Sequence, residues 1–598
     1  MSGPQLTMIL LSSILILALG TTLCSSTILD NVADLNKLNL KFDFIVVGGG
    51  TAGAVVGNRL SENPNNSVLV LEAGISDAGI LDIAVPFYSL RVTPNTAVDW
   101  NYSTTAQVGL NGRSIAYPRG FVLGGSSSVN DMIYTRGSKE DYDRWANITG
   151  DDGWSWDQLI PYMRKNERFT PPSNETTEKF NPAVHGFNGI NTVSLQGFPN
   201  IIDSRVIQTT TELAEFPFNL DMNSGYPLGI GWQQQTVKNG SRSSSATSYF
   251  APQFISRPNL QVLLHARVTR VLQTNSNNTF RTVEFVQDLA GEKFTLTAEK
   301  EVILSAGSIG TPNILLHSGI GNSTTLSSLG INAVHDLPSV GQNLTDHPLI
   351  SISFLVNSSG TWEDAERNAT LAAEQLAQWN ATKTGPLIDS IVPQLGWFRI
   401  PDNSSIFGQV PDPSAGPNTP HYELIFISGL FGVLPPTGNF MGVVPAVVSP
   451  TSRGSVTLES NDTLSNPLID PNLLSSDYDL FVMREAIKSA LRFATPPAWQ
   501  NFVISPFNVN STYTDGELDN FIRENAGTIF HPSGTAKMSP KDAAWGVVDP
   551  DLSVKGLSGL RAVDLSIAPL IPAAHTQAAA YIIGERGSDL IKEAWGQI

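Results

Sequence analysis

The sequence predicts an α/β protein of two domains, in which one domain is assembled from segments that lie far apart in the chain. Three observations support this prediction. The 598 residues exceed what one ordinary hydrophobic core accommodates. Residues 42–72 read as a strand, a glycine-rich turn, a helix and a second strand, and residues 298–321 repeat the order of strand, turn and helix. A long apolar helix is expected near the C-terminus, after Ala574.

The composition is typical of a globular protein, with 41% hydrophobic and 15% charged residues. The formal net charge is −18. Such an acidic surface repels nucleic-acid phosphates and anionic lipids. The sequence therefore predicts neither nucleic acid nor a membrane as a partner.

The N-terminal region reads as a secretion signal. The apolar run from Met8 to Leu19 is too short to span a bilayer but suits the core of a signal peptide; a short membrane anchor is the alternative. We predict a signal peptide over residues 1–25 and a secreted, extracellular protein. Cys24, the only cysteine, lies in this segment, so the mature chain is expected to lack disulfides, a thiol nucleophile and thiolate metal ligands.

Asn-x-Ser/Thr tripeptides recur along the rest of the chain. One such tripeptide carries little weight, because these residues are common in loops. Behind a signal-like start, their density predicts an N-glycosylated protein. The acceptor asparagines are Asn101, Asn147, Asn174, Asn239, Asn322, Asn343, Asn357, Asn368, Asn380, Asn403, Asn461 and Asn510.

The first strand–turn–helix unit carries a glycine pattern. Gly48-x-Gly50-x-x-Gly53, with Thr51 and Ala52 between the last two glycines, follows the strand at 42–47 and opens a helix at 54–60. The first glycine allows the tight turn, the second lets the backbone approach a pyrophosphate, and the third lets the helix pack on the strand. The helix N-terminus then faces the phosphates with its partial positive charge.

Glu72 ends the second strand, at 68–71, where a dinucleotide fingerprint places an acid that accepts from a ribose hydroxyl. An acid there disfavours a 2′-phosphate and therefore NADP. The alternative reading of the glycines alone is a turn between packed elements. Only one such fingerprint is present, which favours a bound flavin that oxidises its substrate directly over an enzyme that uses FAD and NAD(P) together.

Further elements are expected between these segments. The pattern Ser138-x-x-Asp141 predicts the start of a helix over 139–146. Other helices are expected at 156–166 and 365–379, a strand at 260–273, and a loop at 401–420.

Four further stretches carry a resemblance to a known family. They read GFVLGGSSSVNDMIYTRGSKEDYD from Gly120, GSIGTPNILLHSGIG from Gly307, TIFHPSGTAKM from Thr528 and AAHTQ from Ala573. Together with the glycine fingerprint they resemble the glucose–methanol–choline (GMC) oxidoreductases over nearly the whole mature chain. The details are most similar to fungal aryl-alcohol oxidases, with pyranose dehydrogenases close behind.

The resemblance implies a Rossmann-like FAD-binding domain of discontinuous segments and a substrate domain with an antiparallel sheet and helices. The FAD-binding domain is expected at 40–150, 231–345 and 511–598, and the last of these segments carries the active-site histidines. The substrate domain is expected at 151–230 and 346–510.

The resemblance also implies the residues that bind FAD. Pyranose dehydrogenases carry a flavin-linking histidine at the position of Val129, so FAD is expected to be non-covalent here. The expected FAD contacts are Gly48, Gly50, Thr51, Ala52, Gly53, Glu72, Gly124, Gly125, Asn130, Asp131, Met132, Ile133, Val268, Asp564, Thr576 and Gln577.

Oxidation of an alcohol requires removal of the hydroxyl proton and transfer of a hydride to flavin N5, and histidine is the natural proton acceptor near neutral pH. By resemblance, His531 is the general base and His575 hydrogen-bonds the substrate oxygen. The remaining histidines share no pattern and read as structural; no HExxH motif or close His–His pair predicts a metal. These are His185, His265, His317, His335, His347 and His421.

Three residues are expected to line the substrate pocket. Phe530, directly before the base, would border the flavin and gate access, unless it only packs in the core. Phe431 aligns loosely with an aromatic residue of the substrate funnel. Asp131 stands where aryl-alcohol oxidases carry an aromatic residue, and could accept a hydrogen bond from a polyol or bond locally at the turn.

The sequence therefore predicts a secreted, FAD-dependent oxidase that converts a primary, aromatic alcohol to the aldehyde and reduces O2 to H2O2; it leaves the oligomeric state open, with a monomer favoured. The first alternative is a pyranose dehydrogenase that acts on a sugar and passes electrons to a quinone. A flavin-containing hydroxynitrile lyase is a further alternative. A serine hydrolase is disfavoured, because no GxSxG elbow is present.

Overall fold

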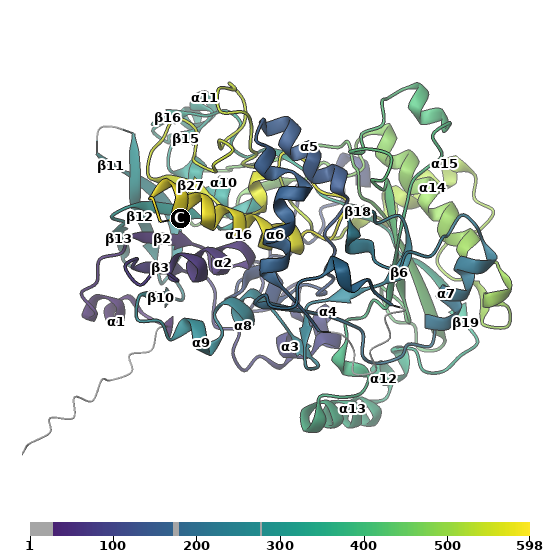
Figure 1. Cartoon of the computed structure of the whole chain (residues 1–598). Coiled ribbons are helices and arrows are strands. Elements are labelled where there is room, and N and C mark those ends of the chain that lie inside the picture. The colour runs from purple at the N-terminus through teal and green to yellow at the C-terminus, as the bar shows by residue number, and fades with distance from the viewer. Residues whose placement is uncertain (1–27, 171–178, 276–277, 598) are drawn as a thin grey trace, which may run out of the picture.

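The computed structural model describes residues 28–170, 179–275 and 278–597. Two large sheets lie in different halves of the molecule (Figure 1). The predicted signal peptide, Cys24 and Asn174 fall outside the described residues. Across the described ranges, no helix combines the length and the apolar character that a membrane span requires.

The first sheet has six strands, all of which pair in parallel. Most residues of its strands are apolar and buried, as expected of a parallel sheet covered on both faces. They come from widely separated parts of the chain, which confirms the predicted α/β fold of discontinuous segments. In spatial order they are β1 (Ile28–Leu29), β10 (Leu260–Leu263), β3 (Val68–Leu71), β2 (Phe44–Val47), β14 (Glu301–Leu304) and β27 (Leu560–Ala562).

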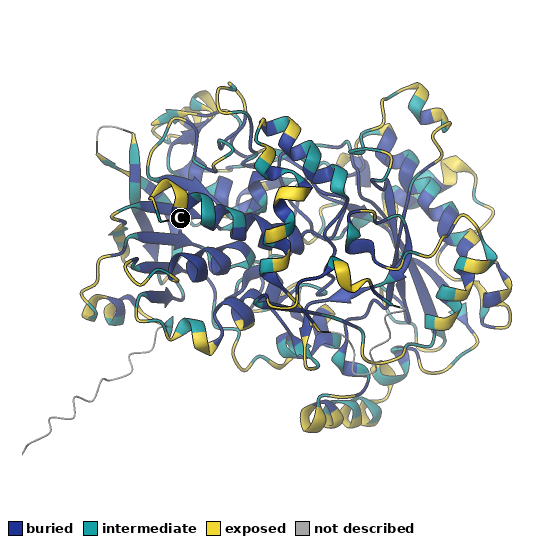
Figure 2. Ribbon diagram, viewed as in Figure 1, coloured by how far each residue is buried: buried dark blue, intermediate teal, exposed yellow. Residues whose placement is uncertain are grey.

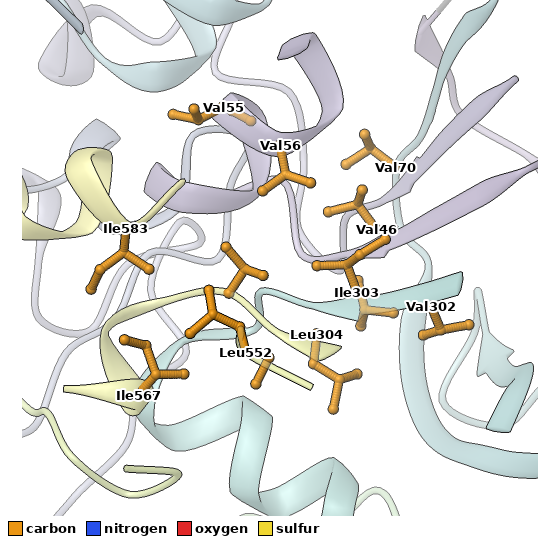
Figure 3. Packing of buried hydrophobic residues seen from close by; sticks show 14 of the residues in the cluster. Val46, Val55, Val56, Val70, Val302, Ile303, Leu304, Leu552, Ile567 and Ile583 are labelled. Carbon is orange, nitrogen blue, oxygen red and sulfur yellow. The ribbon is translucent and has the colours of Figure 1, made fainter. Parts of the chain in front are cut away.

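Three helices follow the ends of strands in this sheet: α2 (Thr51–Leu60), α10 (Gly307–His317) and α16 (Gln577–Ala594). Val46 and Ile303 of the sheet share one buried cluster with Val55 of α2 and Ile583 of α16 (Figure 3). Helices α2 and α16 approach closely at Gly584. A Cβ at this position would lie only 3.0 Å from the Ala52 carbonyl oxygen. This packing holds the N-terminal ends of the helices in fixed positions.

The second sheet has eight strands and is antiparallel. Helix α14 (Asp477–Phe493) packs on the face that carries Leu424 and Phe426, so the opposite face, with Ile425, is turned away from it. The main strands are β25 (Val503–Pro506), β19 (Ile352–Val356), β22 (Asn439–Val447), β21 (Tyr422–Ile427), β20 (Gln394–Phe398) and β6 (Gly229–Trp232), and the short β18 (Pro348–Leu349) and β26 (Gly527–Thr528) extend it.

Two sequence predictions need correction. The strand expected at 260–273 is two strands in different sheets: β10 ends at Leu263, and β11 (Arg267–Asn275) pairs with β12 (Thr279–Val286), which pairs with β13 (Lys293–Thr297). His265 lies between β10 and β11 with a φ of 56°, which turns the chain out of the parallel sheet.

The helix expected at 365–379 is also two elements, α12 (Glu363–Arg367) and α13 (Ala369–Thr382). Asn368 is extended, and its side chain accepts from the backbone N–H groups of Thr370 and Leu371. An N-cap of this kind starts a new helix rather than continuing the old one. Helix α13 stands away from the body of the protein and is mostly exposed (Figure 2).

The other helix predictions agree with the structure. Ser138 and Asp141 form the capping box of α5 (Lys139–Thr149), and α6 (Trp156–Asn166) follows. Further elements are α1 (Val32–Lys37), α3 (Leu81–Ala84), α4 (Ser89–Val92), α7 (Asp203–Glu212), α8 (Ser245–Tyr249), α9 (Pro252–Ile255), α11 (Ser323–Ser328), α15 (Asp515–Asn525), β4 (Glu167–Thr170), β5 (Asn191–Leu195), β7 (Gln234–Gln235), β8 (Val237–Lys238), β9 (Ser241–Arg242), β15 (Ile320–Gly321), β16 (His335–Asp336), β17 (Gln342–Leu344), β23 (Gly454–Thr457) and β24 (Leu468–Asp470).

Most acceptor asparagines that the structure describes are exposed. Asn343 is different. It is half-buried, its side-chain amide points at the Gly534 carbonyl oxygen at 3.4 Å, and the next two residues, Leu344 and Thr345, are buried. Asn343 is therefore less open to solvent than the other acceptor asparagines that the structure describes.

A buried charge cluster joins the first family-like stretch to the strands beside it. His185 lies between two carboxylates, with Nδ1 3.0 Å from Glu167 and Nε2 2.8 Å from Asp221. Arg136 donates to the same Glu167 at 2.5 Å. Burial lowers the pKa of His185, but the bonds to Asp221 and Glu167 outweigh burial and raise it.

We predict that His185→Gln lowers the free energy of unfolding by about 3–5 kcal/mol, because it leaves the buried Asp221 without its hydrogen-bonded cation. A raised histidine pKa stabilises the fold fully below the unfolded-state pKa of about 6.5, and this contribution is lost as pH rises through the folded-state value. The difference between wild type and variant should therefore shrink with rising pH in denaturant titrations. His335→Gln, at a half-buried site, is the matched control, and a difference that does not vary with pH would contradict the prediction.

Candidate functional site

A cavity of about 800 Å³ lies between the two sheets. One side is formed by the ends of α2, α10 and α16 together with residues 125–133. The other side is formed by the face of the antiparallel sheet that carries Ile425 and by the loops over it. Ligand sites commonly lie in such a position, between domains and beyond the carboxyl ends of parallel strands.

The glycine fingerprint forms the cavity wall at the start of α2. No side chain caps this helix, so its first N–H groups are free to bind an anion. Gly50, Thr51 and Ala52 line the cavity. A Cβ on Gly50 would meet only the Gly125 Cα, at 3.7 Å, so within the protein this position is open.

The outer glycines of the fingerprint serve the backbone. Gly48 has a φ of 100°, and a Cβ there would lie 2.5 Å from the Ser305 carbonyl oxygen. A Cβ on Gly53 would lie 1.9 Å from the Gly48 carbonyl oxygen. Gly53 does not line the cavity; it allows α2 to pack on the strand before it, as the fingerprint requires.

Two buried carboxylates reach the cavity from this side. Glu72 accepts from the backbone N–H groups of Gly49 and Gly74, each at 2.8 Å, and burial raises its pKa to about 7. Asp564 accepts from the N–H of Gly307 and the hydroxyl of Thr311, and burial raises its pKa as well. Both acids therefore hold the glycine-rich turns beside them.

The stretch from Gly124 to Ile133 runs along the cavity. Gly125 packs against Gly50: a Cβ added to Gly125 would lie 2.7 Å from the Gly50 Cα. Gly124 was expected to contact FAD but does not line the cavity. Its N–H donates to the Gly49 carbonyl oxygen at 2.8 Å instead. Asn130, Asp131, Met132 and Ile133 all line the cavity, and so does Val129.

The start of α16 closes this side. Thr576 caps the helix without a side-chain hydrogen bond, and Gln577 donates to the Ile133 carbonyl oxygen at 2.7 Å. A second uncapped helix N-terminus therefore faces the cavity. Val268 of β11 also lines it, at some distance along the chain from the other contacts.

His531 and His575 meet in the cavity. Their ring centroids are 4.9 Å apart and the rings are nearly perpendicular. His575 Nε2 lies 2.9 Å from the buried Glu423 on β21, and the backbone N–H of His575 donates to Thr135. Burial, followed by the positive charges that His575, His347 and Arg119 carry when protonated, lowers the pKa of His531 well below its ordinary value.

Sequence reasoning missed the residues that surround this pair. His347 was expected to be an unrelated structural histidine, but its Nδ1 lies 3.0 Å from Nδ1 of His531. Glu423 could have been noticed as the single acid in the otherwise apolar strand Tyr422–Ile427, because a buried charge needs a partner. Nothing in one sequence places His347 beside His531, which lies far away in the chain.

The other histidines lie outside the cavity. His421 hydrogen-bonds Asp412, His335 contacts the Lys555 carbonyl oxygen, and His317 is buried in α10. Within the described ranges, no group of three His, Cys, Asp or Glu residues is placed to hold a metal ion.

The far wall of the cavity is apolar. Strand β21 alternates, so that Glu423, Ile425 and Ile427 face the cavity side. Phe530 lies beside the histidines with a φ of 63°, and Arg119 donates to its carbonyl oxygen at 2.6 Å. Further lining residues are Phe87, Leu349, Trp362, Ile391, Val392, Leu430, Phe431, Leu434, Val444 and Ile529.

The fold and the site define a dinucleotide-binding protein with a histidine pair at the inner end of its cavity. Comparison with known families agrees. The GMC oxidoreductase N-terminal family model matches residues 42–349, and the C-terminal model matches residues 450–584. The chain belongs to the GMC oxidoreductases, a family of FAD-dependent enzymes that act on CH–OH donors, and the sequence prediction of this family is confirmed.

Several relatives are similar along their whole length. A dehydrogenase of Hericium erinaceus, eriK, is 42% identical over 95% of this chain and 97% of its own. Pyranose dehydrogenase 3 of Leucoagaricus meleagris is 41% identical over 93% and 94%. Among solved structures, formate oxidase of Aspergillus oryzae has a TM-score of 0.86 at 30% identity, covering 93% of this chain and 98% of that chain. A fungal aryl-alcohol oxidase has a TM-score of 0.81 at 25% identity, covering 93% and 99%.

FAD, the cofactor of the family, fits the residues present. Gly50 leaves open the space that a pyrophosphate needs, and the free N–H groups of α2 face it. Glu72 lies at the cavity for a ribose hydroxyl. The start of α16, the backbone of 129–133 and the two histidines line the part of the cavity that would take the isoalloxazine end.

Proposed function

We propose that this enzyme oxidises a primary aromatic alcohol to the aldehyde, with O2 reduced to H2O2. The apolar wall opposite His531 and His575 carries this proposal. Most side chains there are aliphatic or aromatic, so the wall offers few hydrogen-bond partners to a sugar. Burying polyol hydroxyls against such a surface without partners would cost free energy.

The histidines divide the work on the substrate hydroxyl. His531 is neutral at physiological pH, because its pKa is lowered, and it takes the hydroxyl proton as general base. Glu423 accepts the Nε2–H of His575 and orients its ring, and His575 donates to the substrate oxygen through Nδ1–H when both ring nitrogens carry a proton. FAD, when bound, supplies the acceptor for the carbinol hydride.

Aromatic residues restrict the approach to the histidines. Phe530 packs edge-on against Tyr117, with ring centroids 6.4 Å apart, and borders the cavity directly before the base. Phe431 lies at the far wall, half-buried. We infer that Phe530 and Phe431 exclude water from the reacting carbon and contact the aryl ring of the substrate.

A second candidate is a pyranose dehydrogenase that passes electrons to a quinone. Two observations favour it: the identity to pyranose dehydrogenases along the whole chain, and the carboxylate of Asp131 in the cavity wall. A carboxylate accepts hydrogen bonds from adjacent hydroxyls, which an aryl ring does not offer.

Anaerobic flavin reduction separates these candidates. We expect p-methoxybenzyl alcohol to bleach the flavin faster than glucose at equal concentration, and air to reoxidise it with formation of H2O2. Bleaching by glucose alone, followed by reoxidation with benzoquinone but not with air, would establish the sugar dehydrogenase instead. A flavoprotein that no alcohol bleaches would point to a lyase.

We further propose that FAD is bound non-covalently, because Val129 lies where pyranose dehydrogenases attach the flavin and valine offers no nucleophilic atom. Precipitation of the purified protein with acid should therefore release the yellow chromophore into the supernatant. Val129→His, which restores the linking residue type, is the matched comparison. Flavin that stays with precipitated wild-type protein would contradict the proposal.

A further inference from the structure

Beside the catalytic histidine pair lies a third, fully buried histidine whose role the proposed function does not assign. His347 is wholly buried and follows Asp346 directly. Strands β18 and β26 pair antiparallel with Pro348 opposite Thr528, and Thr345 pairs with Ser533. This ladder places residues 346–347 across from 530–531.

Asp346 binds the backbone of both histidines. Its Oδ1 accepts the N–H of His347 and the N–H of His531, each at 2.7 Å. Its Oδ2 accepts the hydroxyls of Tyr117 at 2.5 Å and Thr528 at 2.7 Å. One buried carboxylate with four donors thus fixes the loop that carries His531 relative to His347.

The rings of His347 and His531 face each other through their Nδ1 atoms. Nδ1 of His347 and Nδ1 of His531 are 3.0 Å apart, and the rings are nearly perpendicular. At this distance one nitrogen must carry a proton and the other must offer a lone pair. The two neutral rings therefore differ in the nitrogen that they protonate.

His347 is suited to the accepting role. Burial, followed by the positive charge that His575 can carry, lowers the pKa of His347 to about 3, so the ring stays neutral. The role of His531 as base needs a bare Nε2, so the proton of His531 lies on Nδ1, and Nδ1 of His347 is the acceptor 3.0 Å away.

We propose that Asp346 and His347 are positioning residues that hold His531 as the Nδ1–H tautomer, with the lone pair of Nε2 available to the substrate hydroxyl. Asp346 sets the distance between the rings, and Nδ1 of His347 accepts the proton of His531 Nδ1. The alternative tautomer of His531 would place its proton on Nε2 and its lone pair against His347, where no substrate reaches. This inference rests on the proposed function of His531 as base.

The tautomer is measured directly in the wild-type holoenzyme. Protein labelled with 15N-histidine gives long-range proton–nitrogen spectra that distinguish a protonated ring nitrogen from a bare one. The spectrum of His531→Asn assigns the His531 signals by their loss. At neutral pH we expect protonated Nδ1 and bare Nε2 for His531; protonated Nε2 in the wild type would overturn the inference.

Two variants of His347 test its role. His347→Leu removes the acceptor, so His531 should populate the Nε2–H form, and anaerobic flavin reduction by an alcohol should slow by at least about tenfold. His347→Gln restores an acceptor oxygen and should recover most of the rate and the wild-type tautomer. His335→Gln, remote from the cavity, is the control. An unchanged tautomer and rate in His347→Leu would overturn the inference.

The measurements separate the failure of this inference from failure of the proposed function. If no alcohol reduces the wild-type flavin, the proposed function fails, while the spectrum still reports the tautomer of His531. If His347→Leu does not retain FAD, the wild-type spectrum decides alone.

Discussion

Replacing His531 with alanine should slow anaerobic flavin reduction by about 10²- to 10⁴-fold, the usual contribution of a positioned general base. FAD should remain bound, because the side chain of His531 supports no glycine turn and no helix N-terminus of the cofactor wall. Stopped-flow reduction with a benzylic alcohol measures the rate, and the ratio of flavin to protein absorbance measures occupancy. A variant that keeps the wild-type rate would exclude His531 as the base.

The lowered pKa of His531 also predicts how the rate of the wild-type enzyme depends on pH. Burial and neighbouring positive charges lower the pKa of His531 well below its ordinary value, so the wild-type base stays unprotonated through the neutral range. The rate of flavin reduction should therefore be flat around neutrality and fall only in acid, as pH drops through the lowered pKa. An acid limb near about 6.5, the ordinary histidine pKa, would contradict this assignment.

Alanine at Gly50 and at Gly53 should have different consequences, although the two glycines belong to one motif. In Gly50→Ala the new methyl group meets nothing closer than 3.7 Å within the protein, so the fold should keep its thermal stability. The methyl group points into the space expected for the pyrophosphate, so FAD affinity should fall by at least about tenfold, and activity with it. The flavin content of the purified protein measures the loss.

Gly53→Ala is the matched comparison. Its methyl group would lie 1.9 Å from the Gly48 carbonyl oxygen, so α2 must shift away from the strand. We expect a loss of stability of about 1–3 kcal/mol or more, with or without FAD, as for other overpacked sites. Equal effects of the two substitutions on stability, or full FAD occupancy in Gly50→Ala, would show that the motif does not hold the pyrophosphate.

Much of the cofactor wall could be predicted from the sequence because its signals are local. The fingerprint Gly48-x-Gly50-x-x-Gly53 and Glu72 lie within one strand–helix–strand unit, where spacing alone determines geometry. The capping pattern at Ser138 is local in the same sense. Gly124 shows the limit of this reasoning, because its place behind Gly49 rather than in the cavity depends on the contact between two distant turns.

The predictions that were wrong or incomplete depend on tertiary contacts. The apolar run after Leu260 reads as one strand, but the positive φ of His265 sends its second half into another sheet. The helix predicted at 365–379 is the exception, because a local signal divides it: Asn368 caps its second part. His347 and Glu423 reach the histidine pair only through strand pairings of the antiparallel sheet, and these pairings leave no trace in the local pattern of the sequence.

One measurement tests the central claim most directly: the visible spectrum of the purified protein before and after one equivalent of p-methoxybenzyl alcohol is added without oxygen. The account predicts a flavin spectrum at the start, its bleaching by the alcohol, and formation of one equivalent of aldehyde. A protein without flavin absorbance, or one whose flavin keeps its spectrum with every alcohol supplied, would contradict the claim that the two histidines and FAD form an alcohol-oxidising site.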